Sequence, residues 1–343
     1  MKTAISLCML TILAAPALAT VGFQQVSVPD PKGKPLSVGV WYPSLGTPTV
    51  AAVGPFQQMV VPDGAVSGAG LPLALISHGT SGSDASHYDT AIALADAGFV
   101  VAALTHTGDN FRDQSYAGNE MDLTDRPRQV CVVLNYMLKT WPQHDRLDRT
   151  RIGMFGFSLG GFTALVVSGA VPEVGRMRQL CSQRPTAPEC LFIKQRNGDQ
   201  LNPPTPAPDW FHDRRVKAAV IAAPAASYLF GPGSLHGLKI PIQLWRAAQD
   251  EQVPDAWNTA LLREGLPTPP EEHVVAGAGH YGFLPPCGEA LAKQAPQICD
   301  DAPGFDRTTF HQEFNSAIVA FFKKTLVRRQ ADERNRNSGP WGL

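Results

Sequence analysis

The chain has 343 residues, of which 44% are hydrophobic and 17% are charged, and its formal net charge is -1. This length and apolar content suffice to bury one large core. The near-neutral charge argues against partners such as nucleic acids or anionic membrane surfaces. No apolar run long enough to cross a bilayer follows the first 20 positions, so we expect no membrane span in the mature protein.

Residues 1–19 have the features of an export signal peptide. Lys2 supplies a positive charge, Ala4–Ala15 is a short apolar stretch, and Ala17-Leu18-Ala19 places small residues at a cleavage site. We therefore expect the mature protein to begin near Thr20 and to be periplasmic or secreted. The alternative is a buried N-terminal helix that stays part of the fold.

The first half of the mature chain passes from alternating to continuous apolar patterning. Two alternating stretches separated by a Pro- and Gly-containing turn predict an antiparallel hairpin over Val21–Val28 and Leu36–Tyr42. A loop rich in Gly and Pro follows the hairpin. Apolar runs then alternate with helical patterns in the order Leu71–Ile76, Ala91–Ala97 (helical), Phe99–Leu104, Asp122–Leu138 (helical) and Arg151–Phe155.

The second half continues this alternation after a helix that ends near Ala170. Its segments are Val216–Ala223, Ile240–Trp245, Asp255–Glu264 (helical), His273–Ala276 and a long terminal helix over Thr308–Val327. Continuous apolar runs that alternate with helices are typical of parallel strands buried on both faces. The sequence thus predicts an α/β fold with a mostly parallel, doubly wound sheet, spanning about residues 20–330, and a flexible polar tail at 331–343.

The segment Pro172–Asp213 interrupts the alternation. It is rich in proline and charge and too long for an ordinary connection. One interpretation is a cap or lid over the carboxyl edge of the sheet, whose Phe192, Trp210 and Phe211 would wall an acyl pocket. The other is a peripheral loop in which these aromatic residues only pack the insertion.

Five cysteines remain after residue 19, which suits a disulfide-containing exported protein. Cys181 with Cys190, and Cys287 with Cys299, are close neighbours in loop-like segments, so we expect two local disulfides. Cys131 is then a small apolar helix residue. There is no Cys-x-x-Cys motif and no histidine pair with ligand spacing on a helix, so we expect no metal site.

Ser158 lies in the motif Gly156-Phe157-Ser158-Leu159-Gly160, which predicts a nucleophile elbow. The motif by itself is weak, but a strand candidate precedes it directly and a small-residue helix follows it. An elbow needs such a strand, sharp turn and helix, with glycines where side chains would clash. The helix N-terminus also favours negative charge that develops beside it.

His280 is the best candidate for the base that activates Ser158. It follows the last strand candidate in the run Gly279-His280-Tyr281-Gly282, where a loop returns to the carboxyl edge of the sheet. Of the other histidines, His273 lies in or beside that strand and His311 lies on the terminal helix. His212 and His236 fall in irregular segments.

Asp250 is the candidate acid that orients this histidine. No Asp or Glu occurs from Val216 through Gln249, so Asp250 is the first carboxylate after the Ile240–Trp245 strand. Glu251 and Asp255 compete with it but lie farther from the strand. The order Ser158, Asp250, His280 is the order expected on an α/β-hydrolase fold.

Two backbone amides are candidates for the oxyanion hole. Leu159 follows the nucleophile, and Thr80 lies in the loop after the Leu71–Ile76 strand, where Gly79 permits close approach of the backbone. We expect His78 to brace this loop rather than to act as a second base.

With these residues in place, the chain resembles the dienelactone hydrolase-like branch of the α/β-hydrolases and, within it, bacterial relatives of platelet-activating-factor acetylhydrolase. The similar segments include Val-Gly-Val-Trp-Tyr-Pro, Ser-His-Gly, Asp125-Arg126-Pro127, Gly-Phe-Ser-Leu-Gly-Gly and Gly-His-Tyr. The resemblance implies hydrolysis of carboxylic esters with small or accessible acyl groups, without metal or organic cofactor.

Two departures limit what the resemblance implies. Dienelactone hydrolases use a cysteine nucleophile, whereas this chain has Ser158. The acetylhydrolases take their acid after the strand equivalent to Val216–Ala223, where this chain has no carboxylate. The sequence therefore predicts a serine-dependent hydrolase of small-molecule esters. The alternatives are an acyltransferase with the same residues, a phospholipase-type acetylhydrolase, and a non-enzymatic binding module that retained the fold.

Overall fold

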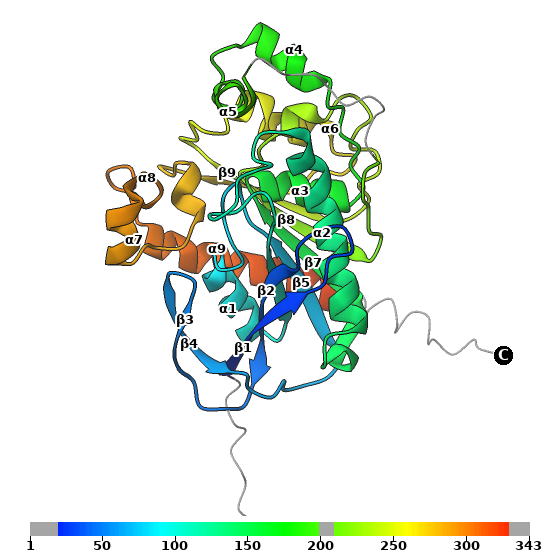
Figure 1. The fold of residues 1–343 in the computed structure, drawn as a ribbon, viewed down its shortest axis with the longest axis vertical. Coiled ribbons are helices and arrows are strands. Elements are labelled where there is room, and N and C mark those ends of the chain that lie inside the picture. Colours follow the sequence, from blue (N-terminus) through cyan, green and yellow to red (C-terminus); the bar gives the residue numbers. More distant parts are fainter. Residues whose placement is uncertain (1–19, 199–208, 329–343) are drawn as a thin grey trace, which may run out of the picture.

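The computed structural model describes residues 20–198 and 209–328 (Figure 1). The expected signal peptide, residues 1–19, and the expected tail, residues 331–343, lie outside the described residues. The same holds for residues 199–208 of the expected cap.

The described residues form one ten-stranded sheet with a parallel centre. Its strands follow the order β10-β9-β8-β7-β5-β6-β2-β1-β4-β3. The six neighbours from β10 to β6 are parallel and comprise β5 (Leu71–Ser77), β6 (Val100–Thr105), β7 (Leu147–Phe157), β8 (Val216–Ala222), β9 (Ile242–Ala247) and β10 (Glu271–Val275). The mostly parallel sheet predicted from the continuous apolar runs is confirmed.

The N-terminal strands add an antiparallel edge. β1 (Thr20–Val28) pairs with β2 (Leu36–Ser44) as the predicted hairpin, and β2 joins the sheet against β6. A second hairpin, β3 (Thr49–Val53) and β4 (Phe56–Pro62), replaces part of the loop expected after the first. Its turn uses Gly54, whose φ of 58° suits a residue without a side chain.

Helices cover both faces of the sheet (Figure 1). α1 (Tyr88–Asp96) and α9 (Arg307–Phe322) pack on one face, and α2 (Glu120–Lys139) and α3 (Leu159–Val167) on the other. Met154 and Phe155, consecutive on β7, belong to the two separate core clusters because side chains alternate across a strand. The fold is doubly wound, as the sequence predicted.

The remaining helices lie at the carboxyl edge and the end of the chain. α4 (Arg176–Gln183) and α5 (Pro188–Asn197) belong to the expected cap. α6 (Thr259–Gly265) starts later than predicted because Asn258 leaves the helical conformation. α9 continues into a π-helical turn over Lys323–Arg328.

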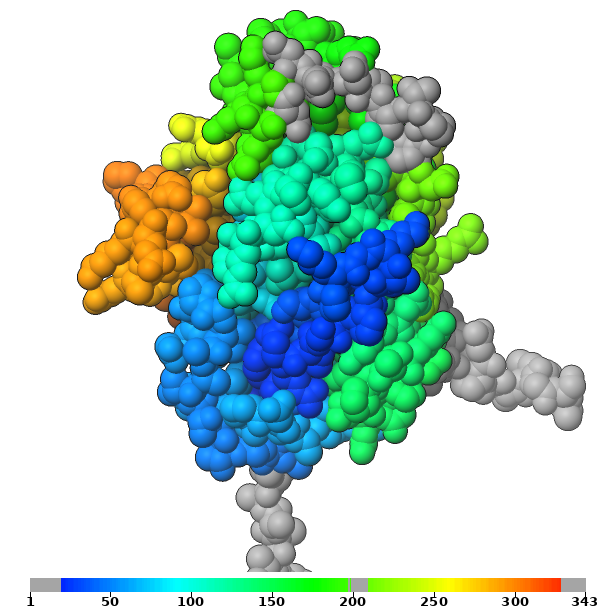
Figure 2. Space-filling view, in the orientation of Figure 1, coloured from blue at the N-terminus to red at the C-terminus, as the bar shows by residue number. Residues whose placement is uncertain are grey.

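α7 (Glu289–Gln294) and α8 (Pro296–Cys299) form a small arm that no sequence pattern predicted. The arm stands out from the body at the side of the molecule, and the cap lies at the top (Figure 2). Disulfides close both elements: Cys181 pairs with Cys190, and Cys287 with Cys299, as expected from the sequence. Among the described cysteines, Cys131 is the one outside a disulfide.

Candidate active site

The candidate residues meet at one edge of the sheet because parallel strands present their carboxyl ends on the same side. Thr80 follows β5, Ser158 follows β7, Asp250 follows β9 and His280 follows β10. The structure therefore brings together all five residues predicted for the site, with Leu159 beginning α3.

Ser158 lies in the sharp turn between β7 and α3. Its φ of 53° is in a region that non-glycine residues rarely occupy. The turn is tight: a side chain at Gly156 would fall on the Gly160 carbonyl, and one at Gly160 would fall on the Ser77 carbonyl. The glycines of the motif are thus required by contacts with backbone, which no side chain adjustment could relieve.

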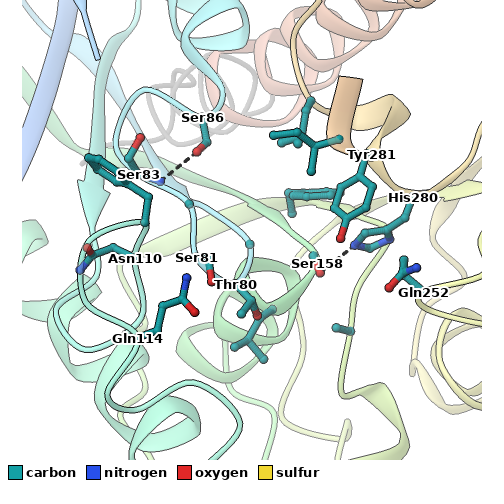
Figure 3. Close-up of a pocket in the computed structure, with 18 of the residues that line it drawn as sticks. Thr80, Ser81, Ser83, Ser86, Asn110, Gln114, Ser158, Gln252, His280 and Tyr281 are labelled. Atoms are coloured by element: carbon teal, nitrogen blue, oxygen red, sulfur yellow. Dashed lines mark hydrogen bonds between the residues drawn. The ribbon is translucent and has the colours of Figure 1, made fainter. Parts of the chain in front are cut away.

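A chain of hydrogen bonds connects Ser158, His280 and Asp250. Ser158 Oγ lies 2.9 Å from His280 Nε2 (Figure 3). On the other side of the ring, His280 Nδ1 lies 2.8 Å from Asp250 Oδ2. All three residues are nearly buried, with Ser158 8% and His280 6% exposed and the Asp250 side chain 6% exposed. The carboxylate fixes the tautomer in which Nδ1 donates, which leaves Nε2 to accept a hydrogen bond from the Ser158 hydroxyl.

The loop after β9 holds Asp250 in place. Its second oxygen, Oδ1, accepts hydrogen bonds from the amides of Gln252 and Val253, at 3.0 and 2.7 Å. The competing carboxylate Asp255 instead forms an ion pair with Arg263 at 2.9 Å. Of the carboxylates near this loop, Asp250 is the one that bonds to His280.

The turn that carries His280 is braced from the C-terminal helix. His311 on α9 donates through Nε2 to the carbonyl of Gly282, at 2.9 Å, and its Nδ1 lies 2.6 Å from Asp89 of α1. The ring of His280 also packs against Phe157, with centroids 4.9 Å apart. His273 is elsewhere, stacked on Trp245 within the sheet.

The two candidate oxyanion amides, Thr80 and Leu159, flank Ser158 and line the same pocket. A side chain at Gly79 would lie 3.1 Å from Ser158 Cβ, so the glycine lets the loop after β5 approach the serine closely. The N-terminus of α3 points at this space, which favours negative charge there.

His78 braces the loop after β5, as expected. Its Nε2 accepts from the amide of His106, which leaves Nδ1 to donate to the carbonyl of Gly79 at 2.5 Å. Burial, together with the positive charge of Arg126, holds the pKa of both histidines well below the ordinary value. Both rings are therefore neutral.

Ser158 opens into a pocket of about 1000 Å³ with walls from three directions. The cap supplies Met177, Phe192 and Ile193, and the arm supplies Leu291 and Ile298. The cap is thus a wall of the pocket rather than a remote loop. Of the aromatic residues noted in the cap, Phe192 lines the pocket, whereas Trp210 packs against Phe162 and Phe211 lies beside Lys32.

The third wall is polar. Beyond Thr80, hydroxyl and amide groups gather on the side of the pocket away from His280 (Figure 3); they belong to Ser81, Ser83, Ser86, Asn110 and Gln114. Near Ser158, the phenol of Tyr281 points towards His280 (Figure 3). Burial, with Asp250 nearby, raises the pKa of Tyr281, so this phenol keeps its proton.

Sequence patterns did not reveal the ion pair behind the site. Arg126 on α2 pairs with Asp109, from the loop after β6, at 2.5 Å, and both side chains are 1% exposed. Arg126 belongs to one of the segments that carry the family resemblance, Asp125-Arg126-Pro127, but that segment does not indicate a partner for it. No sequence pattern marks Asp109, since its role depends on a tertiary contact with a residue 17 positions farther along the chain.

Neither metal-binding nor membrane-spanning features occur in the part of the chain that the structure describes. No group of three or more His, Cys, Asp or Glu side chains could hold a metal ion, and no helix there is long and apolar enough to cross a membrane.

The chain shares its fold with a solved enzyme structure. A ferulic acid esterase from Streptomyces cinnamoneus superposes with a TM-score of 0.59 over 92% of each chain, at 18% sequence identity. No protein-family profile and no curated protein sequence matches the chain. Together with the strand–serine–helix turn, this similarity identifies the architecture as an α/β-hydrolase fold.

Proposed function

We propose that the protein is a serine-dependent carboxylic ester hydrolase that forms an acyl-enzyme on Ser158. The observation that carries the proposal is the hydrogen-bond chain from Ser158 through His280 to Asp250, with distances of 2.9 and 2.8 Å at the base of a pocket. A serine hydroxyl is a weak nucleophile until a base accepts its proton, and this arrangement supplies one.

In the first half-reaction, His280 removes the proton from Ser158 as Oγ attacks the ester carbonyl. The N–H groups of Thr80 and Leu159 stabilise the resulting oxyanion. The tetrahedral intermediate collapses as the protonated His280 gives its proton to the departing alcohol. Asp250 stabilises the imidazolium during both transfers.

In the second half-reaction, water replaces the alcohol. His280 deprotonates the water, which attacks the acyl-enzyme, and the same oxyanion donors act again. Collapse of this intermediate returns the proton to Ser158 and releases the acid. Neither half-reaction needs a metal or an organic cofactor.

The substrate we propose is a small-molecule ester. The pocket is closed on two sides by the cap and the arm, which suits a ligand that enters the cleft. The related fold of a ferulic acid esterase supports ester chemistry on this architecture, although one fold hosts many reactions. Placement in the dienelactone hydrolase-like branch rests on the sequence segments alone and is part of the proposal.

We also propose that residues 1–19 are a signal peptide, that 20–330 form the hydrolase domain with its cap at 172–213, and that the protein acts in the periplasm or outside the cell. The two disulfides support an oxidising compartment.

The test is the substitution Ser158→Ala assayed on a panel of p-nitrophenyl esters graded by acyl length, extended to phthalate esters and a polyester. We expect at least a 10³-fold loss of kcat, because the nucleophile is removed, with the melting temperature almost unchanged. A fluorophosphonate probe should add to the wild-type protein and not to the variant. Retained turnover in the variant would refute the role of Ser158.

Product analysis distinguishes hydrolysis from acyl transfer. With an alcohol present alongside water, a hydrolase releases mainly the free acid, whereas an acyltransferase yields a new ester. A phospholipase-type acetylhydrolase would hydrolyse acetyl phospholipids in preference to every ester of that panel.

A further inference from the structure

We propose that Arg126 is a positioning residue that holds both oxyanion donors, Thr80 and Leu159, in one fixed geometry. The inference rests on the proposed function and extends it to a residue outside the pocket. Arg126 is 1% exposed and does not line the pocket, so it acts through other groups rather than on the substrate.

On one side, Arg126 fixes the loop that carries Thr80. Its Nη2 donates to the carbonyl of His78, and its Nη1 bonds to Asp109 at 2.5 Å. The other oxygen of Asp109 accepts the amide of Ser81 at 2.8 Å. The ion pair therefore holds a carbonyl before Thr80 and an amide after it.

On the other side, Arg126 reaches the helix that carries Leu159. Its Nε donates to Thr163 Oγ1 at 3.2 Å, and this hydroxyl donates to the carbonyl of Leu159 at 2.9 Å. One guanidinium thus connects α2 to both halves of the oxyanion hole. The rigid fork of arginine allows this, and the single ammonium of lysine would not.

The loop needs such support because its own conformation is unfavourable. Ser81 has a φ of 62°, a conformation that non-glycine residues rarely adopt and that persists only where surrounding contacts enforce it. Without the ion pair, the amide of Thr80 would sample several directions.

Stability is a weak explanation for burying this pair. Two charges removed from water often stabilise a fold no more than apolar side chains of the same volume would. A second acid, Asp122, lies close by, but burial and the charge of Asp109 raise its pKa well above the ordinary value. Burial thus favours the uncharged form of Asp122.

The experiment compares Arg126→Met and Arg126→Lys with the matched control Arg128→Met. Arg128 lies two positions away on α2 and is also a buried arginine in an ion pair, 2.6 Å from Asp30, but it makes no contact with the oxyanion loop. For each variant we would measure kcat, KM, the melting temperature and the inhibition constant of a trifluoromethyl ketone. This probe adds to Ser158 and creates an oxyanion, so its affinity reports on the donors.

We expect Arg126→Met to lower kcat by about 10²-fold, the lower end of the cost of losing one oxyanion donor. KM should change less than about twofold, because the ground state does not use the hole. The affinity for the trifluoromethyl ketone should fall by the same factor as kcat/KM. The kcat of Arg126→Lys should lie between those of the wild type and Arg126→Met. Arg128→Met should lower the melting temperature while leaving kcat and the inhibition constant unchanged.

Thr163→Val is the milder second variant, should Arg126→Met not fold. It removes the link to Leu159 and should lower kcat and inhibitor affinity together, by about threefold to tenfold. Unchanged kcat and inhibitor affinity in the folded variants would overturn the inference. Losses of kcat and inhibitor affinity in Arg128→Met as large as those in Arg126→Met would also overturn it. If Ser158→Ala retains activity, the proposed function itself fails, an outcome separate from these.

Discussion

Ser158 occupies a conformation that its neighbours enforce. A positive φ costs a serine about 1–3 kcal/mol, and the turn keeps it because β7 and α3 hold both ends. The strained turn raises the hydroxyl above the sheet, towards His280. Gly160 is the residue on which this depends most, since its α-carbon packs against the backbone of Ser77 and His78.

Gly160→Ala is expected to destabilise the protein by about 3 kcal/mol, because a methyl group there overlaps backbone that cannot move aside. Urea unfolding would measure the change. The matched control is Gly175→Ala: this glycine has open space around it and a φ of -57°, so its variant should remain within about 1 kcal/mol of wild type. Equal effects at the two positions would show that the elbow is not tightly packed.

The residues of the hydrogen-bond chain could be predicted because each has a local signature. Ser158 is flanked by glycines between a strand and a helix, and Asp250 ends a long stretch without carboxylates. Asp109 and Arg126 have no such signature, since their pairing joins the loop after β6 to α2 and appears only in three dimensions.

At the scale of elements, the alternation of apolar runs and helices was sufficient to predict the parallel sheet. The arm of α7 and α8 escaped prediction because its helices span six and four residues, too short for a periodic pattern. The β3–β4 hairpin was hidden by the Gly- and Pro-rich sequence around it. Trp41 donates to Gln58 of β4, a tertiary contact that no local pattern reveals.

A disulfide between Cys287 and Cys299 closes the arm. Helices this short are not stable alone, and the arm contributes Leu291 and Ile298 to the pocket. Replacing both Cys287 and Cys299 with serine should raise KM by about threefold to tenfold, a cost on the order of 1 kcal/mol for ordering the arm around the substrate. We expect little change in kcat, since Ser158 and His280 are untouched.

The measurement is steady-state kinetics on the ester panel, with Cys131→Ala as the control for loss of a cysteine. Cys131 forms no disulfide, and burial raises the pKa of its thiol to about 12. An unchanged KM for every ester in the double variant would mean that the arm does not contact the substrate.

At the scale of the whole molecule, the core contains a histidine that resists protonation. His87 precedes α1 and packs edge-on against Phe155 and Phe157, with ring centroids 5.0 and 5.3 Å away. Neither ring nitrogen has a partner among the described residues. Burial lowers the pKa of His87 from 6.5 to about 3; Asp89 opposes the shift and His311 adds to it.

This pKa makes the fold sensitive to acid. Between pH 6.5 and 3 the unfolded chain binds a proton at His87 that the folded chain does not, so stability falls as the pH drops through this range. Between pH 6.5 and 5, the free energy of unfolding of His87→Phe should fall by roughly 2 kcal/mol less than that of the wild type. At pH 7.5 the substitution should not lower the free energy of unfolding. Urea unfolding at several pH values would test this; parallel curves for variant and wild type would contradict it.

The contact between His311 and the Gly282 carbonyl gives the C-terminal helix a part in the order of events during biosynthesis. A ribosome makes Ser158 long before it makes α9. The turn that presents His280 gains its brace only when residues 307–322 have emerged and docked. In the proposed mechanism, a chain that ends before residue 307 therefore lacks the contact that braces the turn of the base, His280.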